Sequence, residues 1–353
     1  MKRLLLILTF LLAISSYAAN QPAGLKVTNN GSSYSVEFQL PAYNMTEIGK
    51  DGENFVKISI DGYGITSEAG YPELPQITFN LVVPANATEE NITVSTNNIS
   101  YSNINLSSKV YPFQAPWSKS EPLGKRPFNF NRAYYETEGR LNQPTIKISE
   151  PFVIGGVTGV MVTIYPFNYN PARNLLKAIS NGSFTINLPQ AIQKSTGHSE
   201  SFDTYLKEIF TSFNPVNSGK GMNYLIITAP EYEATMQQFV NFKASNGYSV
   251  AMFTTATTGT TTAAIKSFIQ TRYNDPNLKP EYILLVGDVD KIPYWVGTGE
   301  GTPSTDLNYG LLAGTDHFAD AFVGRFSVTS TTELQNIINK TIYMTNNIGT
   351  LPK

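Results

Sequence analysis

Apolar and polar positions alternate in short runs through the first two hundred residues, and Gly, Pro and Asn separate the runs. The clearest runs are residues 34–40, 56–60, 77–81, 160–164 and 184–188. A repeat of two residues brings every second side chain to the same face of a strand, so one face can be buried while the other meets water. The pattern therefore predicts an antiparallel all-β sandwich or barrel for this part of the chain.

From residue 223 onward, the apolar positions follow a different pattern. Residues 224–228 and 282–286 are almost continuously apolar, which is typical of strands covered on both faces. Two further strands are expected at 248–254 and 321–324. The four runs together predict a sheet that lies inside its domain.

Helical spacing occupies the intervals between these strands. Apolar side chains recur every three to four residues in 231–245 and 260–273, and the capping box Ser330-x-x-Glu333 predicts the start of a last helix. Strands that alternate with helices form right-handed βαβ units and a parallel sheet. The fold class expected for the chain is therefore α+β with two domains, an N-terminal antiparallel all-β domain and a partial α/β parallel-sheet domain.

Residues 193–221 separate the two patterns and have no period of their own. The segment is polar and rich in Gly, Ser and Asn, so we expect an interdomain linker or processing region. Lys207 and Lys220 are its candidate cleavage positions, and His198 is expected to be solvated.

The first 18 residues have the three parts of a secretory signal peptide. Lys2 and Arg3 form a basic start, residues 4–14 are apolar, and Ser16 and Ala18 supply small residues before a cleavage site. A membrane anchor is the alternative, but a bilayer-spanning helix needs about 18–20 apolar residues. We therefore expect a secreted or extracytoplasmic protein, at the bacterial cell surface or outside the cell, with no membrane span.

Charge and cysteine content exclude several classes of function. The 25 Lys and Arg residues nearly balance 27 Asp and Glu residues, and the formal net charge is −2. No basic excess is present for nucleic-acid binding. The chain has no Cys and two His, which excludes disulfides, thiolate nucleophiles and a typical zinc site.

Three aspartates suggest a site for a hard cation. Asp288 follows the predicted strand at 282–286, and Asp316 and Asp320 lie four residues apart in a turn before the next strand. Calcium binds roughly six to eight oxygen atoms from carboxylates, carbonyls and water. The pattern alone leaves open that these aspartates only form turns and caps. His317 follows Asp316, but adjacent side chains usually point apart, so a surface histidine is favoured over a catalytic dyad.

The motifs around these aspartates resemble those of the gingipain family, which comprises secreted bacterial cysteine endopeptidases with a caspase-like fold. The matching segments are 282–288 with Ile292-Pro293, 306–310, 314–326, and, farther upstream, 70–75 and 164–171. The resemblance implies a zymogen. Its parts are a signal peptide at 1–18, a β-rich inhibitory propeptide domain at 19–192, a linker or processing region at 193–221 and the N-terminal part of a peptidase domain at 222–353.

The resemblance also implies site residues and partners. The family's calcium ligands correspond to Asp288, the carbonyl of Ala313, Asp316, the carbonyl of Phe318 and Asp320, where Asp320 replaces a Glu. The partners implied are protein or peptide substrates of the complete enzyme and the propeptide itself, which packs on its own catalytic domain.

Two functions follow as alternatives. The family's catalytic His and Cys lie beyond the segments matched here, and no Cys is present, so this chain alone is expected to be an inactive precursor portion. The alternative is a non-catalytic secreted binding protein with a vestigial peptidase-like half.

Overall fold

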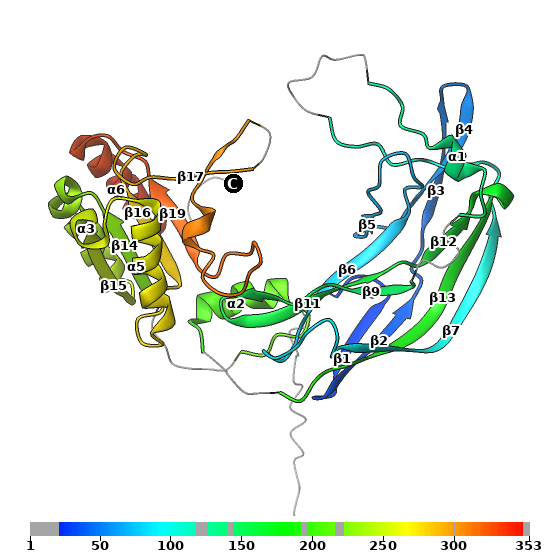
Figure 1. Cartoon of the computed structure of the whole chain (residues 1–353), viewed down its shortest axis with the longest axis horizontal. Helices are drawn as coiled ribbons and strands as arrows, with labels where there is room; N and C mark the ends of the chain where they lie inside the picture. Colours follow the sequence, from blue (N-terminus) through cyan, green and yellow to red (C-terminus); the bar gives the residue numbers. More distant parts are fainter. Residues whose placement is uncertain are drawn as a thin grey trace, which may run out of the picture.

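The structure consists of an all-β domain and an α/β domain that lie side by side (Figure 1). It is a computed structural model that describes residues 21–117, 126–139, 144–191, 197–215, 222–298 and 301–348. The predicted signal peptide at 1–18 and Lys220 lie outside the described residues.

The all-β domain is built around two five-stranded sheets. One has the order β1-β2-β13-β12, with β7 also on β13; its strands are β1 Leu25–Asn29, β2 Ser33–Gln39, β13 Leu175–Asn187, β12 Phe167–Asn170 and β7 Thr93–Asn105. The other has the order β10-β11-β6-β5, with β9 also on β11; its strands are β10 Phe152–Ile154, β11 Val157–Ile164, β6 Pro75–Val82, β5 Gly64–Ile65 and β9 Ile146–Ile148. A third sheet contains β3 Asn44–Lys50, β4 Glu53–Ser59 and β8 Lys109–Val110.

Four of the five alternating runs form the core between the two large sheets, and the run 56–60 belongs to a second cluster. Val36, Phe79, Val162 and Phe184 come from four of these runs and belong to one buried cluster. Burial of each such side chain stabilises the fold by about 1.5–3 kcal/mol. The pairing within both large sheets is antiparallel, as the alternation predicts, whereas β4 and β8 pair in parallel.

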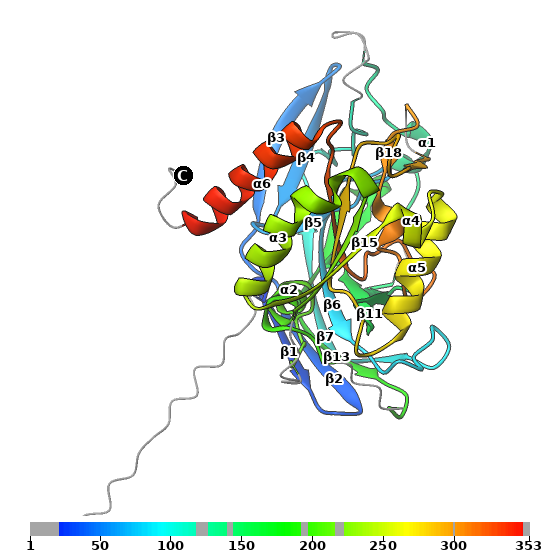
Figure 2. The ribbon, with the colours of Figure 1, turned by 90° about the vertical axis from the view of Figure 1, so that its left-hand side faces the viewer.

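The α/β domain contains a four-stranded parallel sheet. Its order is β15-β14-β16-β19, with the strands β15 Tyr248–Thr254, β14 Met222–Thr228, β16 Tyr282–Val286 and β19 Phe322–Phe326. Helices α3 (Glu233–Ser245) and α6 (Thr331–Asn346) cover one face, and α5 (Thr262–Asn274) covers the other (Figure 2). These elements agree with the strands and helices expected from the sequence.

The helix faces and one cap also follow the predicted pattern. Ile265, Ile269 and Tyr273 are the buried residues of α5. Ser330 is the N-cap of α6, and its hydroxyl accepts a hydrogen bond from the Glu333 N–H. The Glu333 carboxylate accepts from the N–H of Thr329, one residue before the position that a capping box predicts.

The expectation that residues 193–221 form a polar linker is wrong for the part that contains α2 (Glu200–Ile209). Ser199 caps this helix, and Phe202, Leu206 and Phe210 are buried against Phe152 and Ile154 of β10. Their spacing of four residues forms an apolar stripe that the surrounding polar residues conceal in the sequence.

Several short elements complete the described chain: α1 Arg132–Tyr135, α4 Thr255–Thr258, η1 Pro171–Arg173, η2 Pro230–Tyr232, η3 Leu307–Tyr309, β17 Trp295–Val296 and β18 Ser304–Thr305. Within the described ranges, no helix combines the length and apolar character required to cross a bilayer.

Candidate functional site

Asp320 lies at the base of a turn that precedes β19, and its carboxylate is almost completely buried. Only 1% of the residue is exposed. Oδ2 accepts hydrogen bonds from the N–H groups of Leu312 (2.8 Å) and Ala313 (2.6 Å), which close the turn on itself. Oδ1 accepts from the N–H of Gly155 in the all-β domain at 3.0 Å. One carboxylate thus organises its own turn and joins it to the other domain.

Burial is the main influence on Asp320. It raises the pKa of the carboxyl above the ordinary value, while the N–H donors of Ala313, Leu312 and Gly155 act in the opposite direction. The carboxylate of Asp316 raises this pKa further, because two like charges lie close together.

Asp316 forms a second link between the domains. Its Oδ1 accepts from the N–H of Phe318 within the turn, and its Oδ2 accepts from the N–H of Val153 in β10, both at 2.8 Å. The Phe318 ring lies 4.8 Å from the Phe152 ring, centroid to centroid. The predicted ligands Ala313, Asp316, Phe318 and Asp320 are therefore close along one turn that faces the all-β domain.

Asp288 does not join this turn. It follows β16, its N–H donates to the carbonyl of Val328, and its Oδ1 accepts from the Ser327 hydroxyl at 2.7 Å. That hydroxyl lowers the pKa of the Asp288 carboxyl. Asp288 thus lies beyond the carboxyl end of the sheet.

The parallel register places Asp288 and Asp320 at opposite edges. Tyr282 pairs with Phe322 and Val286 with Phe326, so Asp320 lies before the start of both strands and Asp288 lies after their end. At roughly 3.3 Å per residue, the separation along the strands is on the order of 20 Å. The five predicted ligands therefore do not fit a single cation, and the described ranges contain no group of three or more Asp, Glu or His side chains arranged to hold a metal.

The Arg325 guanidinium donates four hydrogen bonds at the carboxyl edge of the sheet, the edge at which parallel sheets usually bind ligands. Its Nε and Nη2 donate to the two oxygens of Asp306 at 2.8 and 2.7 Å. Its Nη1 donates to the carbonyls of Gly287 and Ile292, each at 2.9 Å. Sequence reasoning missed this group, although Asp306 and Arg325 both lie in the motifs that resemble the gingipains.

The two histidines have different environments. His317 is exposed, as expected. His198 is buried rather than solvated: its Nε2 lies 2.9 Å from the Gly155 carbonyl oxygen, and its ring stacks on Phe202. Burial lowers the pKa of His198. The prediction of a solvated His198 is wrong because the residue lies just before the cap of α2 and packs between Phe202 of that helix and Gly155.

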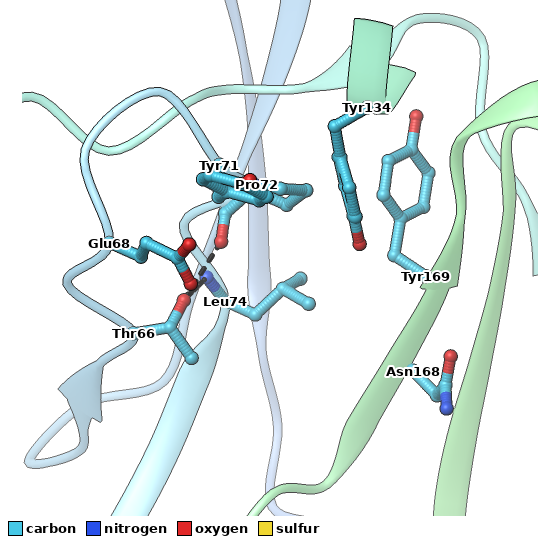
Figure 3. Close-up of a pocket in the computed structure, with 8 residues that line it drawn as sticks. All are labelled: Thr66, Glu68, Tyr71, Pro72, Leu74, Tyr134, Asn168 and Tyr169. Atoms are coloured by element: carbon cyan, nitrogen blue, oxygen red, sulfur yellow. Dashed lines mark hydrogen bonds between the residues drawn. The ribbon is translucent and has the colours of Figure 1, made fainter. Parts of the chain in front are cut away.

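A separate pocket in the all-β domain contains none of the predicted site residues (Figure 3). The Thr66 hydroxyl donates to the Pro72 carbonyl and accepts from the Leu74 N–H, and these bonds form the loop on one side of the pocket. Tyr134 and Tyr169 lie on the other side. Glu68 is the one carboxylic acid among its lining residues, which also include the hydroxyl groups of Tyr71, Tyr134 and Tyr169.

Comparison with known proteins finds two family matches along the chain. Propeptide_C25 matches residues 18–220, and Peptidase family C25 matches residues 217–352. Lys-gingipain HG66 of Porphyromonas gingivalis is 30% identical over 365 residues, which cover 97% of this chain and 21% of that protein. Gingipain R2 of the same species is 27% identical over 337 residues, which cover 90% of this chain and 44% of that protein.

Solved structures are also similar to this chain. A structure of gingipain K from P. gingivalis, described in terms of its zymogenic latency, is 28% identical with a TM-score of 0.43. The match covers 49% of this chain and 96% of that one.

Proposed function

Because the chain belongs to the gingipain family, peptidase family C25, we propose that it is the precursor portion of a secreted cysteine endopeptidase. The all-β domain with α2 would be the inhibitory propeptide, and the α/β domain would be the first part of the catalytic domain. The observation that carries this proposal is that both family matches occur in one chain and meet between the end of α2 and the start of β14. A vestigial binding protein is less favoured, because both domains keep recognisable family sequences.

The chemistry of the proposed enzyme requires groups that this chain does not supply. A cysteine peptidase needs a thiolate, a histidine base within hydrogen-bond reach and donors for the oxyanion. The sequence contains no Cys, so we infer that the 353-residue chain is inactive as a thiol peptidase. Its own residues would instead shape the scaffold: Arg325 holds the loops at the carboxyl edge, next to which ligands of parallel sheets bind.

A comparison of two gene products tests this function. The 353-residue chain and the longest product encoded at its locus are incubated with casein and with lysyl and arginyl peptides, with and without iodoacetamide. The relatives' name Lys-gingipain makes the lysyl peptide the first choice. We expect activity from a longer, Cys-containing product, its loss with iodoacetamide, and none from the 353-residue chain. Hydrolysis by the purified 353-residue chain would refute the inference that this chain is an inactive precursor portion.

We also propose a calcium site confined to the turn before β19. It would use the carboxylates of Asp316 and Asp320 and the carbonyls of Ala313 and Phe318, with water as the remaining ligands. Two features support this site. The carboxylates of Asp316 and Asp320 lie close enough for their like charges to interact. Both oxygens of Asp316 and Oδ1 of Asp320 each accept one N–H and retain a second lone pair. A bound calcium would supply structural cross-linking of this turn.

Thermal unfolding with calcium and with EDTA tests the proposed site. Calcium at about 100 times its Kd would stabilise the folded chain by about 2.7 kcal/mol. The Asp316→Asn variant should lose this response, whereas Asp288→Asn should keep it because Asp288 lies at the opposite edge of the sheet. An unchanged melting temperature together with no heat in a calorimetric titration would exclude calcium at the turn.

We propose an extracytoplasmic location on the basis of the N-terminal sequence and the named relatives. Fractionation of the native host followed by N-terminal sequencing should find the mature chain starting near Ala19 outside the cytoplasm. Recovery of a cytoplasmic chain that retains residues 1–18 would contradict this.

A further inference from the structure

The hairpin of β10 and β11 ends in a two-glycine turn at the boundary between the domains. Ile154 pairs with Val157, so Gly155 and Gly156 form the tip. Their φ angles are +63° and +91°, and two successive positive φ values are typical of a type I′ turn. We call β10, β11 and this tip the docking hairpin.

The backbone of Gly155 is bound from both sides by charged or polar side chains. Its N–H donates to Asp320 of the α/β domain at 3.0 Å. Its carbonyl accepts from the Lys279 ammonium at 2.6 Å and lies 2.9 Å from His198 Nε2. The N–H thus donates to a negatively charged carboxylate, and the carbonyl accepts from a positively charged ammonium. Hydrogen bonds with one charged partner are stronger than those between neutral groups.

A second backbone group extends this contact along the free edge of β10. The N–H of Val153 donates to Asp316 at 2.8 Å. Residues 153 and 155 are two positions apart, so their N–H groups leave the strand on the same side. Two carboxylates of one turn thus take the place that a neighbouring strand would occupy.

Glycine is also required by the packing around the hairpin. A Cβ on Gly155 would lie 2.4 Å from Cε1 of Phe202, and a Cβ on Gly159 would lie 2.2 Å from Cε1 of Phe210. Phe202 in turn packs on Phe322 of β19, with 5.4 Å between the ring centroids. The two glycines therefore leave room for two aromatic rings of α2 at the interface.

From these contacts we propose that the docking hairpin is the recognition element through which the propeptide domain holds the peptidase domain, and that Asp320 is its principal receptor. This inference rests on the proposed zymogen function. The partner of the Asp316–Asp320 turn is a glycine-tipped strand edge, recognised through backbone N–H groups. Gly155→Ala should release the peptidase domain and also displace Phe202 of α2, whereas the core between the two large sheets and the core of the parallel sheet should remain folded.

Distance measurement between spin labels tests the proposal on the full chain. Because the chain lacks Cys, Thr96→Cys in β7 and Lys340→Cys in α6 can be labelled selectively; both positions are exposed. We expect a single narrow distance distribution for the parent. Gly155→Ala should broaden this distribution, so that fewer than half of the molecules keep the parent distance.

Gly31→Ala is the matched control. Gly31 has a φ of +85°, so alanine meets the same backbone strain, but nothing lies within 4 Å of its Cβ. It should keep the parent distribution. A folded Gly155→Ala chain with an unchanged distribution would overturn the proposal.

A second variant gives an answer if Gly155→Ala does not fold. Lys279→Met removes one donor to the Gly155 carbonyl and keeps an apolar stem. The native distance should then disappear at a lower urea concentration than in the parent, and an identical urea dependence would count against the docking role. These measurements report domain contact without any peptidase activity, so failure here is distinguishable from failure of the proposed enzyme function.

Discussion

The ion pair between Arg325 and Asp306 provides the sharpest energetic prediction. Replacing Arg325 with Met removes both bonds to Asp306 and leaves the carbonyls of Gly287 and Ile292 without this donor. The two side chains are only 12% and 26% exposed, so water can replace the lost bonds only in part.

Burial sets the expected magnitude. Removal of one partner of a fully buried pair costs about 3–5 kcal/mol, whereas an exposed pair contributes about 0–1 kcal/mol. The pair here lies nearer the buried limit. We therefore expect Arg325→Met to lower the free energy of unfolding of the α/β domain by about 3 kcal/mol, with a coupling energy to Asp306 of about 2 kcal/mol.

Tryptophan fluorescence offers a local assay. The chain has two Trp residues, and Trp295 packs on Tyr309 at 4.5 Å in the loops that Arg325 holds. A Trp117→Phe background makes Trp295 the sole indole reporter. Urea unfolding of Arg325→Met, Asp306→Asn and the double variant then gives the coupling energy from a double-mutant cycle.

Arg132 and Glu53 form the matched control pair. Their N–O distance of 2.6 Å is even shorter, but Arg132 is 68% exposed. If burial rather than distance determines the energy, this pair should couple by less than about 1 kcal/mol. Equal coupling energies for the two pairs would refute the reasoning.

Three further predictions concern other parts of the molecule. Burial lowers the pKa of His198 below its ordinary value of 6.5. As the pH falls through 6.5, the unfolded chain therefore binds a proton that the folded chain does not, which favours unfolding. The melting temperature should fall from pH 7.5 to pH 5.5, and it should fall less in His198→Gln. A pH dependence identical in both proteins would contradict this. The buried Tyr34 hydroxyl bonds to the Val82 carbonyl at 2.7 Å, so Tyr34→Phe should cost about 1 kcal/mol in urea unfolding, and a cost near zero would show that water replaces the bond. Leu285 is fully buried in β16, so Leu285→Ala should cost about 2–5 kcal/mol, while Val296→Ala at a 65% exposed position should stay within about 0.5 kcal/mol; similar losses for both would invalidate the burial assignment.

The periodicity of the sequence identified the main elements of the α/β domain and five strands of the all-β domain, but neither β7 nor α2. The strand at 34–40 is observed as β2, and the continuous run at 282–286 is β16. The helix after Ser330 begins where its cap predicts. These features depend on neighbours within a few residues, so local sequence contains the information that determines them.

The tertiary structure decided most of the contacts among the site residues. The separation of Asp288 and Asp320 is the exception, because one follows a strand and the other precedes a strand of the predicted parallel sheet, and the observed register places them at opposite edges. His198 and Phe202 looked like linker residues because their partners lie far earlier in the chain: Phe202 packs on Phe152 and Ile154 of β10, and His198 lies against the Gly155 carbonyl. The sequence therefore determined which segments become strands and helices. Which distant groups meet was not determined in this local way. The Gly155 N–H and the Asp320 carboxylate are 165 residues apart, and only the packing of whole elements brings them within hydrogen-bonding distance.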